Sequence, residues 1–276
     1  MEELPLIARA RTHADRIALE KGRASYSYAD LLTRSEDVAT ALLAGDDDLN
    51  EGRVAFLIPT GIHHTAVQWG IWRAGGIAMP LCLSATEPEW EYALTDSDST
   101  IVVCTREHVD KIQPLCLRLD RRILILEQVS ADPSVKLPEI SADRRAMILY
   151  TSGTTSKPKG VVTTHANIQA QIEALVEAWE WQADDRIPLF LPLHHIHGII
   201  NVMSCALWMG AKIEPFSKFD LEAICDQVKA DAYTVFMAVP TIYVKLIQAL
   251  DAAEEDERSA IIAGFAKLRL MISGSA

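Results

Sequence analysis

Residues 147–164 read MILYTSGTTSKPKGVVTT and place a hydroxyl-rich loop between two segments of strand character. The central ten residues hold five Ser or Thr side chains, two glycines and two lysines. Hydroxyl and backbone N–H groups can donate hydrogen bonds to an anion, glycine lets the backbone approach it closely, and lysine supplies a point charge. The loop is therefore a candidate polyphosphate site. Its predicted binding residues are Thr151, Ser152, Gly153, Thr154, Thr155, Ser156, Lys159 and Gly160.

This loop is not a Walker A loop. Counted from Gly153, the position that needs the second glycine holds Pro158, and the β-rich run Val161 to Thr164 follows in place of a helix. The plain alternative is a Ser/Thr-rich hairpin turn with two solvated lysines. The loop residues alone leave both interpretations open.

Around this loop, short β-branched runs alternate with longer segments of helical period, which predicts an α/β fold of mostly parallel sheets covered by helices. A proline-bearing linker at about 130–141 divides two packed subdomain halves, about 1–130 and 142–276. The predicted strands are Arg53 to Ile58, Thr100 to Cys104, Arg122 to Leu126, Met147 to Thr151, Tyr233 to Val239 and Leu268 to Ser273.

Composition narrows the class of protein and its partners. Apolar residues make up 49% and charged residues 23%, which is typical of a globular chain and excludes wholesale disorder. Acidic residues outnumber basic ones 38 to 26, so the net charge of -12 would repel a nucleic acid, and none is expected as a partner. The longest apolar stretch, Ile199 to Met209, is too short for a membrane span.

Cysteine usage and the N-terminus bear on the compartment. The five cysteines, at positions 82, 104, 116, 205 and 225, are widely spaced and include no Cys-x-x-Cys pair. This pattern favours reduced thiols. The start of the chain lacks a basic region followed by an apolar stretch, so no secretory signal is expected. Together these features predict a cytoplasmic protein.

Three segments, in order, resemble the adenylate-forming enzymes, which include acyl-CoA synthetases, luciferases and nonribosomal peptide adenylation domains. Thr151 to Gly160 resembles their signature loop TSGTTGxPKG, with Ser156 in place of the usual glycine. The segment LPLHHIHG at 191–198 resembles their second core motif, and LMISGSA at 270–276 resembles the start of the wall that lines the adenine and acyl sites.

The resemblance implies roles for particular residues. His195 corresponds to a histidine beside the acyl carboxylate and the α-phosphate, and together with Lys159 it would be catalytic. The implied acyl pocket consists of His195, Met237, Val239 and Pro240. The implied adenine and acyl wall consists of Ser273, Gly274, Ser275 and Ala276. Within the family, residues 193–198, 236–246 and 270–276 are most similar to malonyl-CoA synthetases and the acyl-CoA synthetase family member 3 type.

The activity implied is that of an ATP-dependent acid–thiol ligase that uses Mg²⁺, a carboxylic acid and coenzyme A. Such a ligase makes acyl adenylate and pyrophosphate, then acyl-CoA and AMP, and the acid would be malonate or another short to medium acid. Family members carry further site residues and a C-terminal domain beyond the three motifs, so the chain is expected to be an incomplete N-terminal AMP-binding domain that is impaired alone. A noncatalytic nucleotide-binding module and a phosphotransferase remain as alternatives.

His194, His195 and His197 lie within four residues, so a zinc site is an alternative to a substrate-side role. No Cys, Asp or Glu lies nearby in the sequence to complete a ligand set, and no metal site is predicted within the chain. His63 and His64, at a predicted helix start, are expected to be surface or capping residues.

Overall fold

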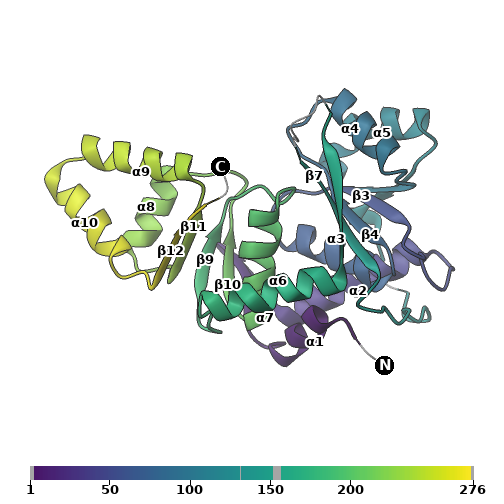
Figure 1. Cartoon of the computed structure of the whole chain (residues 1–276), viewed down its shortest axis with the longest axis horizontal. Coiled ribbons are helices and arrows are strands. Elements are labelled where there is room, and N and C mark those ends of the chain that lie inside the picture. The colour runs from purple at the N-terminus through teal and green to yellow at the C-terminus, as the bar shows by residue number, and fades with distance from the viewer. Residues whose placement is uncertain (1–2, 131, 152–156, 275–276) are drawn as a thin grey trace.

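The computed structural model describes residues 3–130, 132–151 and 157–274. Three sheets follow one another along the long axis of the molecule, and Figure 1 shows the largest sheet, with β3, β4 and β7, at one end. A four-stranded sheet with β9 and β10 lies in the middle, and the pair β11 and β12 lies at the other end. Of the nine strand pairings among the described residues, seven are parallel, so the predicted α/β class is confirmed.

The six-stranded sheet has the order β6-β5-β3-β4-β7-β8. Its neighbours run parallel except for β7 and β8, which form an antiparallel hairpin. Four of its strands overlap the predicted segments at 53–58, 100–104, 122–126 and 147–151. The strands are β3 (Arg53–Leu57), β4 (Ile77–Pro80), β5 (Ile101–Cys104), β6 (Arg122–Ile125), β7 (Arg145–Thr151) and β8 (Lys159–Thr164).

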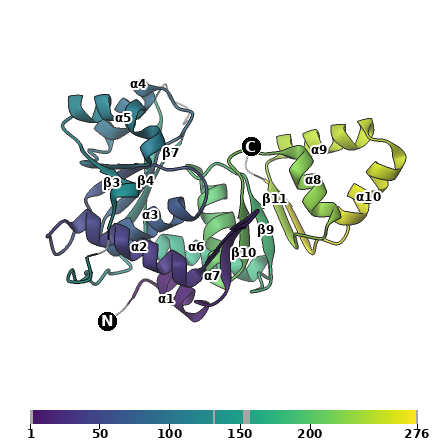
Figure 2. The ribbon, with the colours of Figure 1, turned by 180° about the vertical axis from the view of Figure 1, so that it is seen from behind.

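The four-stranded sheet has the order β2-β1-β10-β9, and Figure 2 shows the purple N-terminal strands beside β10. The strands are β1 (Ile17–Lys21), β2 (Ala24–Ser27), β9 (Arg186–Leu189) and β10 (Lys212–Pro215). The third sheet pairs β11 (Val235–Ala238) with β12 (Leu270–Ser273), within the two remaining predicted segments. Hydrogen bonds between Thr234 and Arg186 join the start of β11 to the start of β9.

Helices cover these sheets, and Figure 1 shows α4 and α5 on one side of the six-stranded sheet with α2 and α3 on the other. The first six helices are α1 (Pro5–Thr12), α2 (Tyr28–Leu43), α3 (Ile62–Arg73), α4 (Glu87–Asp96), α5 (Arg106–Arg118) and α6 (His165–Ala178). The last four are α7 (Cys205–Met209), α8 (Leu221–Lys229), α9 (Pro240–Ala252) and α10 (Glu255–Phe265). A 3₁₀ turn, η1 (Leu126–Gln128), and a π-helix, η2 (His197–Ser204), complete the elements.

Side-chain alternation along β3 explains how one sheet serves two cores. Val54 and Phe56 belong to the larger core between the sheets, whereas Ala55 and Leu57 belong to a smaller core under α4 and α5. Successive side chains of a strand point to opposite faces, so a strand buried on both sides must be apolar throughout. This is why β3 and β5 lack the polar alternation of a half-exposed strand.

The sheets do not follow the predicted division of the chain at 130–141. Residues 132–144 do lack helices and strands. However, β7 and β8 come after this segment and complete the sheet of β3 to β6, and β1 and β2 come before it and extend the sheet of β9 and β10. Each side of the linker therefore gives strands to the other, and the limits of the subdomains stay a prediction.

A buried carboxylate joins the starts of β9, β11 and β12. Asp185, whose side chain is 2% exposed, accepts hydrogen bonds from both Nε and Nη2 of Arg269, from Thr234 Oγ1 at 2.7 Å and from the backbone N–H of Gln182 at 2.8 Å. Burial opposes ionisation, but these hydrogen bonds together outweigh it and lower the pKa of the Asp185 carboxyl below its ordinary value.

Replacing the charged partner should reveal this network. Arg269→Ala should lower the free energy of unfolding by about 3 kcal/mol, since it leaves a buried carboxylate uncompensated. Because the folded-state pKa of Asp185 is lowered, its contribution is present above about pH 4 and is lost as pH falls through the folded pKa. Urea denaturation of both proteins at about pH 7 and about pH 3 should show the difference shrinking with acid.

The matched control is Lys267→Ala, which removes an exposed ion pair with Asp231 in the same part of the chain. It should cost less than about 1 kcal/mol. Equal losses in the two variants at neutral pH would contradict the role assigned to Asp185.

Candidate functional site

The strand ends of the three sheets meet at one cavity of about 500 Å³. The carboxyl ends of parallel strands gather on one side of a sheet, where ligand crevices form. The end of β7 contributes Tyr150 and Thr151, the segment after β9 contributes Pro192 and His195, and the residue after β11 is Val239. Residues distant in sequence thus line a single space.

The described part of the candidate phosphate loop is held by the β7–β8 hairpin. Thr151 pairs directly with Lys159, and Tyr150 pairs with Gly160. A Cβ added to Gly160 would lie 3.1 Å from Ile148 Cγ2 and 3.3 Å from Tyr150 Cζ, so glycine lets the Tyr150 ring lie close to β8. Thr151 and Lys159 are therefore cross-strand neighbours at the base of the loop, and both are exposed. Ser152, Gly153, Thr154, Thr155 and Ser156 lie outside the described residues.

The histidine segment presents its three imidazoles differently. His195 is exposed and lines the cavity, and its ring centroid lies 4.2 Å from that of His194. Burial, with a smaller effect of His195, lowers the pKa of His194 to about 4, so His194 is neutral at physiological pH. His197 is buried, and burial lowers the pKa of its ring as well, despite a hydrogen bond with the backbone of Gly274.

The close approach of two backbone segments fixes where His195 lies. His195 N–H donates to the carbonyl of Pro192 at 3.3 Å, and the His195 carbonyl accepts from Ile199 at the start of η2. A Cβ on Gly198 would lie 2.5 Å from the Pro192 oxygen, closer than real Cβ atoms come. Glycine is therefore required here, and π-helices such as η2 often occur at functional sites.

The wall predicted from the third motif lies beside this segment. Ser273 pairs with Ala238 at the ends of β12 and β11, and Gly274 N–H donates to the Ala238 carbonyl. The hydrogen bond between His197 and Gly274 links this wall to the histidine segment. Ser275 and Ala276 lie outside the described residues.

The predicted acyl-pocket residues separate into two groups. His195 and Val239 line the cavity together. Met237 is fully buried in the larger core, and Pro240 is exposed as the first residue of α9; neither is among the residues that line the cavity. Their assignment to the acyl pocket stays a prediction.

The prediction that His64 is a surface or capping residue is wrong. His64 is 3% exposed, and its ring lies edge-on to Phe56 at 4.9 Å between centroids. Burial lowers its pKa to about 3, with a smaller contribution from His194. The first turn of α3 faces inward because α3 is covered on nearly all sides, which a single helix start does not reveal. The preceding residue, His63, is exposed, as predicted.

Sequence reasoning also missed lining residues on β7 and β8. Tyr150, Val161 and Thr163 line the cavity. The alternation of β8 carried a usable signal, because residues 161 and 163 share one face of a strand. That face could be assigned to a site only once the position of the hairpin was known.

Two further cavities adjoin this one. A cavity of about 650 Å³ shares Tyr150, Thr151 and His194 with it and extends over α4, and another of about 370 Å³ includes His64 and His194. His194 therefore lies where three cavities meet. Because its ring is neutral, His194 adds no charge to the walls of these cavities.

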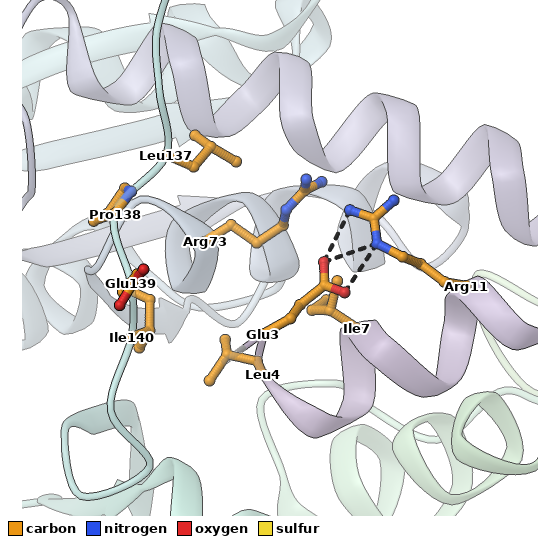
Figure 3. Close-up of a pocket in the computed structure, with 9 residues that line it drawn as sticks. All are labelled: Glu3, Leu4, Ile7, Arg11, Arg73, Leu137, Pro138, Glu139 and Ile140. Carbon is orange, nitrogen blue, oxygen red and sulfur yellow. Dashed lines mark hydrogen bonds and ion pairs between the residues drawn. The ribbon is translucent and has the colours of Figure 1, made fainter. Parts of the chain in front are cut away.

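A remote cavity of about 360 Å³ between α1 and residues 137–140 is less suited to an anion (Figure 3). Figure 3 shows Arg11 joined to Glu3, and Arg73 donates to Leu32, Ser35 and Glu36 outside the cavity. Both guanidinium groups that line it thus already have carboxylate partners. The candidate site remains at the strand ends.

Within residues 3–130, 132–151 and 157–274, no three His, Cys, Asp or Glu side chains come together so as to hold a metal ion. The zinc alternative for His194, His195 and His197 therefore lacks a ligand set in this part of the chain.

In the same ranges, no helix is both long and apolar enough to cross a bilayer. All five cysteines have free thiols.

Comparison with known proteins shows the family to which the chain belongs. A family model described as AMP-binding enzyme matches residues 6–276. The mitochondrial malonate–CoA ligase of Bos taurus is 37% identical over 291 residues, covering 99% of this chain and 49% of that protein. The malonate–CoA ligase of Arabidopsis thaliana is 32% identical, covering 96% of this chain and 50% of that protein.

Among solved structures, ATP-bound MatB from Rhodopseudomonas palustris superposes with a TM-score of 0.83 at 28% identity, over 100% of this chain and 55% of that one. The fold is therefore that of the N-terminal domain of adenylate-forming enzymes. The chain belongs to the AMP-binding enzyme family, which confirms the resemblance of its three motifs. It spans about half the length of the curated relatives it matches.

Gly198 offers a test of the site's construction. Gly198→Ala should lower the free energy of unfolding by about 1–3 kcal/mol, because the added methyl forces the Pro192 carbonyl and η2 apart. Thermal or urea unfolding measures this loss. Gly274→Ala is the control, since no described atom lies within 4 Å of its added Cβ. Equal stability of the two variants would contradict the close approach.

Proposed function

We propose that this chain provides the ATP-binding and acid-binding part of an ATP-dependent acid–thiol ligase. The observation that carries the proposal is the cavity of about 500 Å³ that Thr151, His195 and Val239 line together. Thr151 begins the candidate phosphate loop, and His195 belongs to the segment that resembles the carboxylate-side motif. Attack of a carboxylate on the α-phosphate needs both reactants held within one such space.

The site residues supply the hydrogen-bond donors and the positive charge that this reaction lacks in water. Carboxylate and α-phosphate are both anionic, so fixed donors and positive charge must bring them together. In this proposal the loop from Thr151 to Thr155 holds the β- and γ-phosphates, and Lys159 adds a charge beside Thr151. His195 donates a ring N–H to an oxygen of the reacting carboxylate.

Mg²⁺, when bound, would offset charge on the phosphate oxygens. Coenzyme A would then be the acceptor, because a phosphate-anhydride leaving group makes the acyl carbon open to attack by a thiol. These substrates and the metal are inferred from family membership and from the names of the relatives.

Malonate is the proposed acid. The relatives from Bos taurus and Arabidopsis thaliana are named malonate–CoA ligases, and they match nearly the whole of this chain. A short to medium monocarboxylic acid is the alternative. A second carboxylate would require a cation in the acyl pocket, so the choice between the two is a question of charge.

Two other functions are separated by their products. A phosphotransferase using the same loop would release ADP, whereas the ligase releases AMP and pyrophosphate. A noncatalytic nucleotide-binding module would release neither. A cytoplasmic location stays a prediction from the cysteine pattern, whereas the Bos taurus relative is named mitochondrial.

Acid-dependent exchange of labelled pyrophosphate into ATP tests the proposed function. In the full-length protein that carries this chain, malonate should support faster exchange than acetate or a medium-chain fatty acid. Exchange that does not depend on any acid, or release of ADP, would overturn the ligase proposal. The chain alone should be badly impaired, and normal turnover by it would contradict that expectation.

Lys159→Ala should weaken ATP binding in the same protein. Loss of one charge-assisted contact corresponds to about 1.5–3 kcal/mol, or roughly tenfold or more in the dissociation constant. Isothermal titration with ATP measures the change. Lys111→Ala, which removes an exposed lysine from α5, is the control and should bind as the wild type does. Unchanged affinity in Lys159→Ala would argue against its role.

A further inference from the structure

Helix α4 contacts both described arms of the candidate phosphate loop, although this helix belongs to none of the three family motifs. Tyr150 and Thr151 form the arm that enters the loop, and Lys157 and Pro158 form the arm that leaves it. All four residues line the cavity of about 650 Å³ together with Tyr92. The contacts come from Tyr92, Ala93 and Asp96 of α4.

The leaving arm is held by Tyr92. The Tyr92 hydroxyl donates a hydrogen bond to the carbonyl of Pro158 at 2.9 Å. Lys157 Nζ lies 5.4 Å from the centroid of the same ring, within the range of a cation–π contact. The Pro158 carbonyl and the Lys159 N–H share one planar peptide unit. Tyr92 therefore sets the orientation of the peptide that leads into Lys159.

The entering arm is held by Asp96. The Tyr150 hydroxyl donates to Asp96 Oδ2 at 2.8 Å and lies 3.3 Å from the Ala93 carbonyl. The Tyr92 and Tyr150 rings also meet edge to face, with centroids 6.1 Å apart. Tyr92 of α4 thus contacts both arms, the leaving arm at Pro158 and the entering arm at the Tyr150 ring.

Helix α4 is suited to act as a fixed support. Its first turn is closed by a capping box, in which Glu89 Oε2 accepts from the Thr86 backbone N–H and hydroxyl. Trp90 Nε1 donates to the Cys82 carbonyl at 2.9 Å, and Leu94 is fully buried in the core beneath the helix. The loop arms, in contrast, are exposed at Thr151, Lys157 and Pro158.

We propose that Tyr92 and Asp96 are positioning residues for phosphate binding, which hold the two arms so that Thr151 and Lys159 face the same phosphate chain. This inference rests on the proposed function. Neither residue touches substrate in this scheme; each acts through the loop arm that it contacts.

The test replaces Tyr92 with phenylalanine in the full-length protein that carries this chain. Tyr92→Phe keeps the ring beside Lys157 and removes the hydroxyl group, which donates to Pro158 and also interacts with the Asp96 carboxylate. The dissociation constant for ATP should rise about three- to tenfold, the equivalent of one hydrogen bond. The constant for AMP should not change, because AMP lacks the β- and γ-phosphates. Tryptic cleavage of the Lys159–Gly160 bond should also become faster.

Asp96 supplies a conservative pair of variants. Asp96→Asn keeps an oxygen that can accept from Tyr150 and should bind ATP nearly as the wild type does. Asp96→Ala removes the acceptor and should weaken ATP binding as Tyr92→Phe does. A general loss of folding would lower AMP binding and the melting temperature in all of these variants, and such a result would count against a positioning role.

Tyr26→Phe is the matched control. The Tyr26 ring carries a similar cation–π contact, with Arg34 5.4 Å from its centroid, but lies on β2 in the four-stranded sheet. Its ATP and AMP affinities should equal those of the wild type.

The outcomes separate the two proposals. If the wild type binds ATP more tightly than AMP and Tyr92→Phe matches it in affinity and cleavage, the positioning inference is overturned and the proposed function stands. If the wild type binds ATP no better than AMP, the proposed phosphate site itself fails, and the positioning role fails with it.

Discussion

The pairing of β7 within the six-stranded sheet is the interaction on which the rest of the site depends. β7 is parallel to β4 on one side and antiparallel to β8 on the other, so the chain reverses its direction between Thr151 and Lys159. Trp72 of α3 donates to the Ala146 carbonyl at 2.7 Å and fixes the start of the same strand against the core. The position of β7 between β4 and β8 thus determines where Thr151, its last residue, lies at the edge of the cavity.

A second constraint acts on the opposite wall of the cavity. The close approach of Gly198 to the Pro192 carbonyl directs the chain after β9 back over the strand ends, with His195 exposed toward the cavity. The hairpin and this turn belong to different sheets. Their meeting depends on the larger core, which is continuous between the two sheets and places both sets of strand ends on the same side.

The electrostatics of the site follow from burial. His64, His165 and His194 are desolvated, so their lowered pKa values keep all three neutral at physiological pH. These three rings therefore supply no positive charge to a polyanion, and in the proposed scheme Lys159 and backbone N–H groups supply it. Two imidazoles of the histidine segment, those of His194 and His197, have lowered pKa values, so this segment need not behave as a cationic cluster.

The sequence by itself determined the α/β class, six strand segments and the three motifs, because these depend on local periodicity and on residue types at fixed spacing. It did not reveal β1, β2, β4, β9 and β10. The last three of these have four residues each and end in or contain proline. Only the tertiary structure decided that strands cross the linker between sheets, that His64 is buried, and that Met237 lies in the core while Val239 lines the cavity. These properties depend on which elements pack together, and a strand's two faces are equivalent in sequence until its neighbours are known.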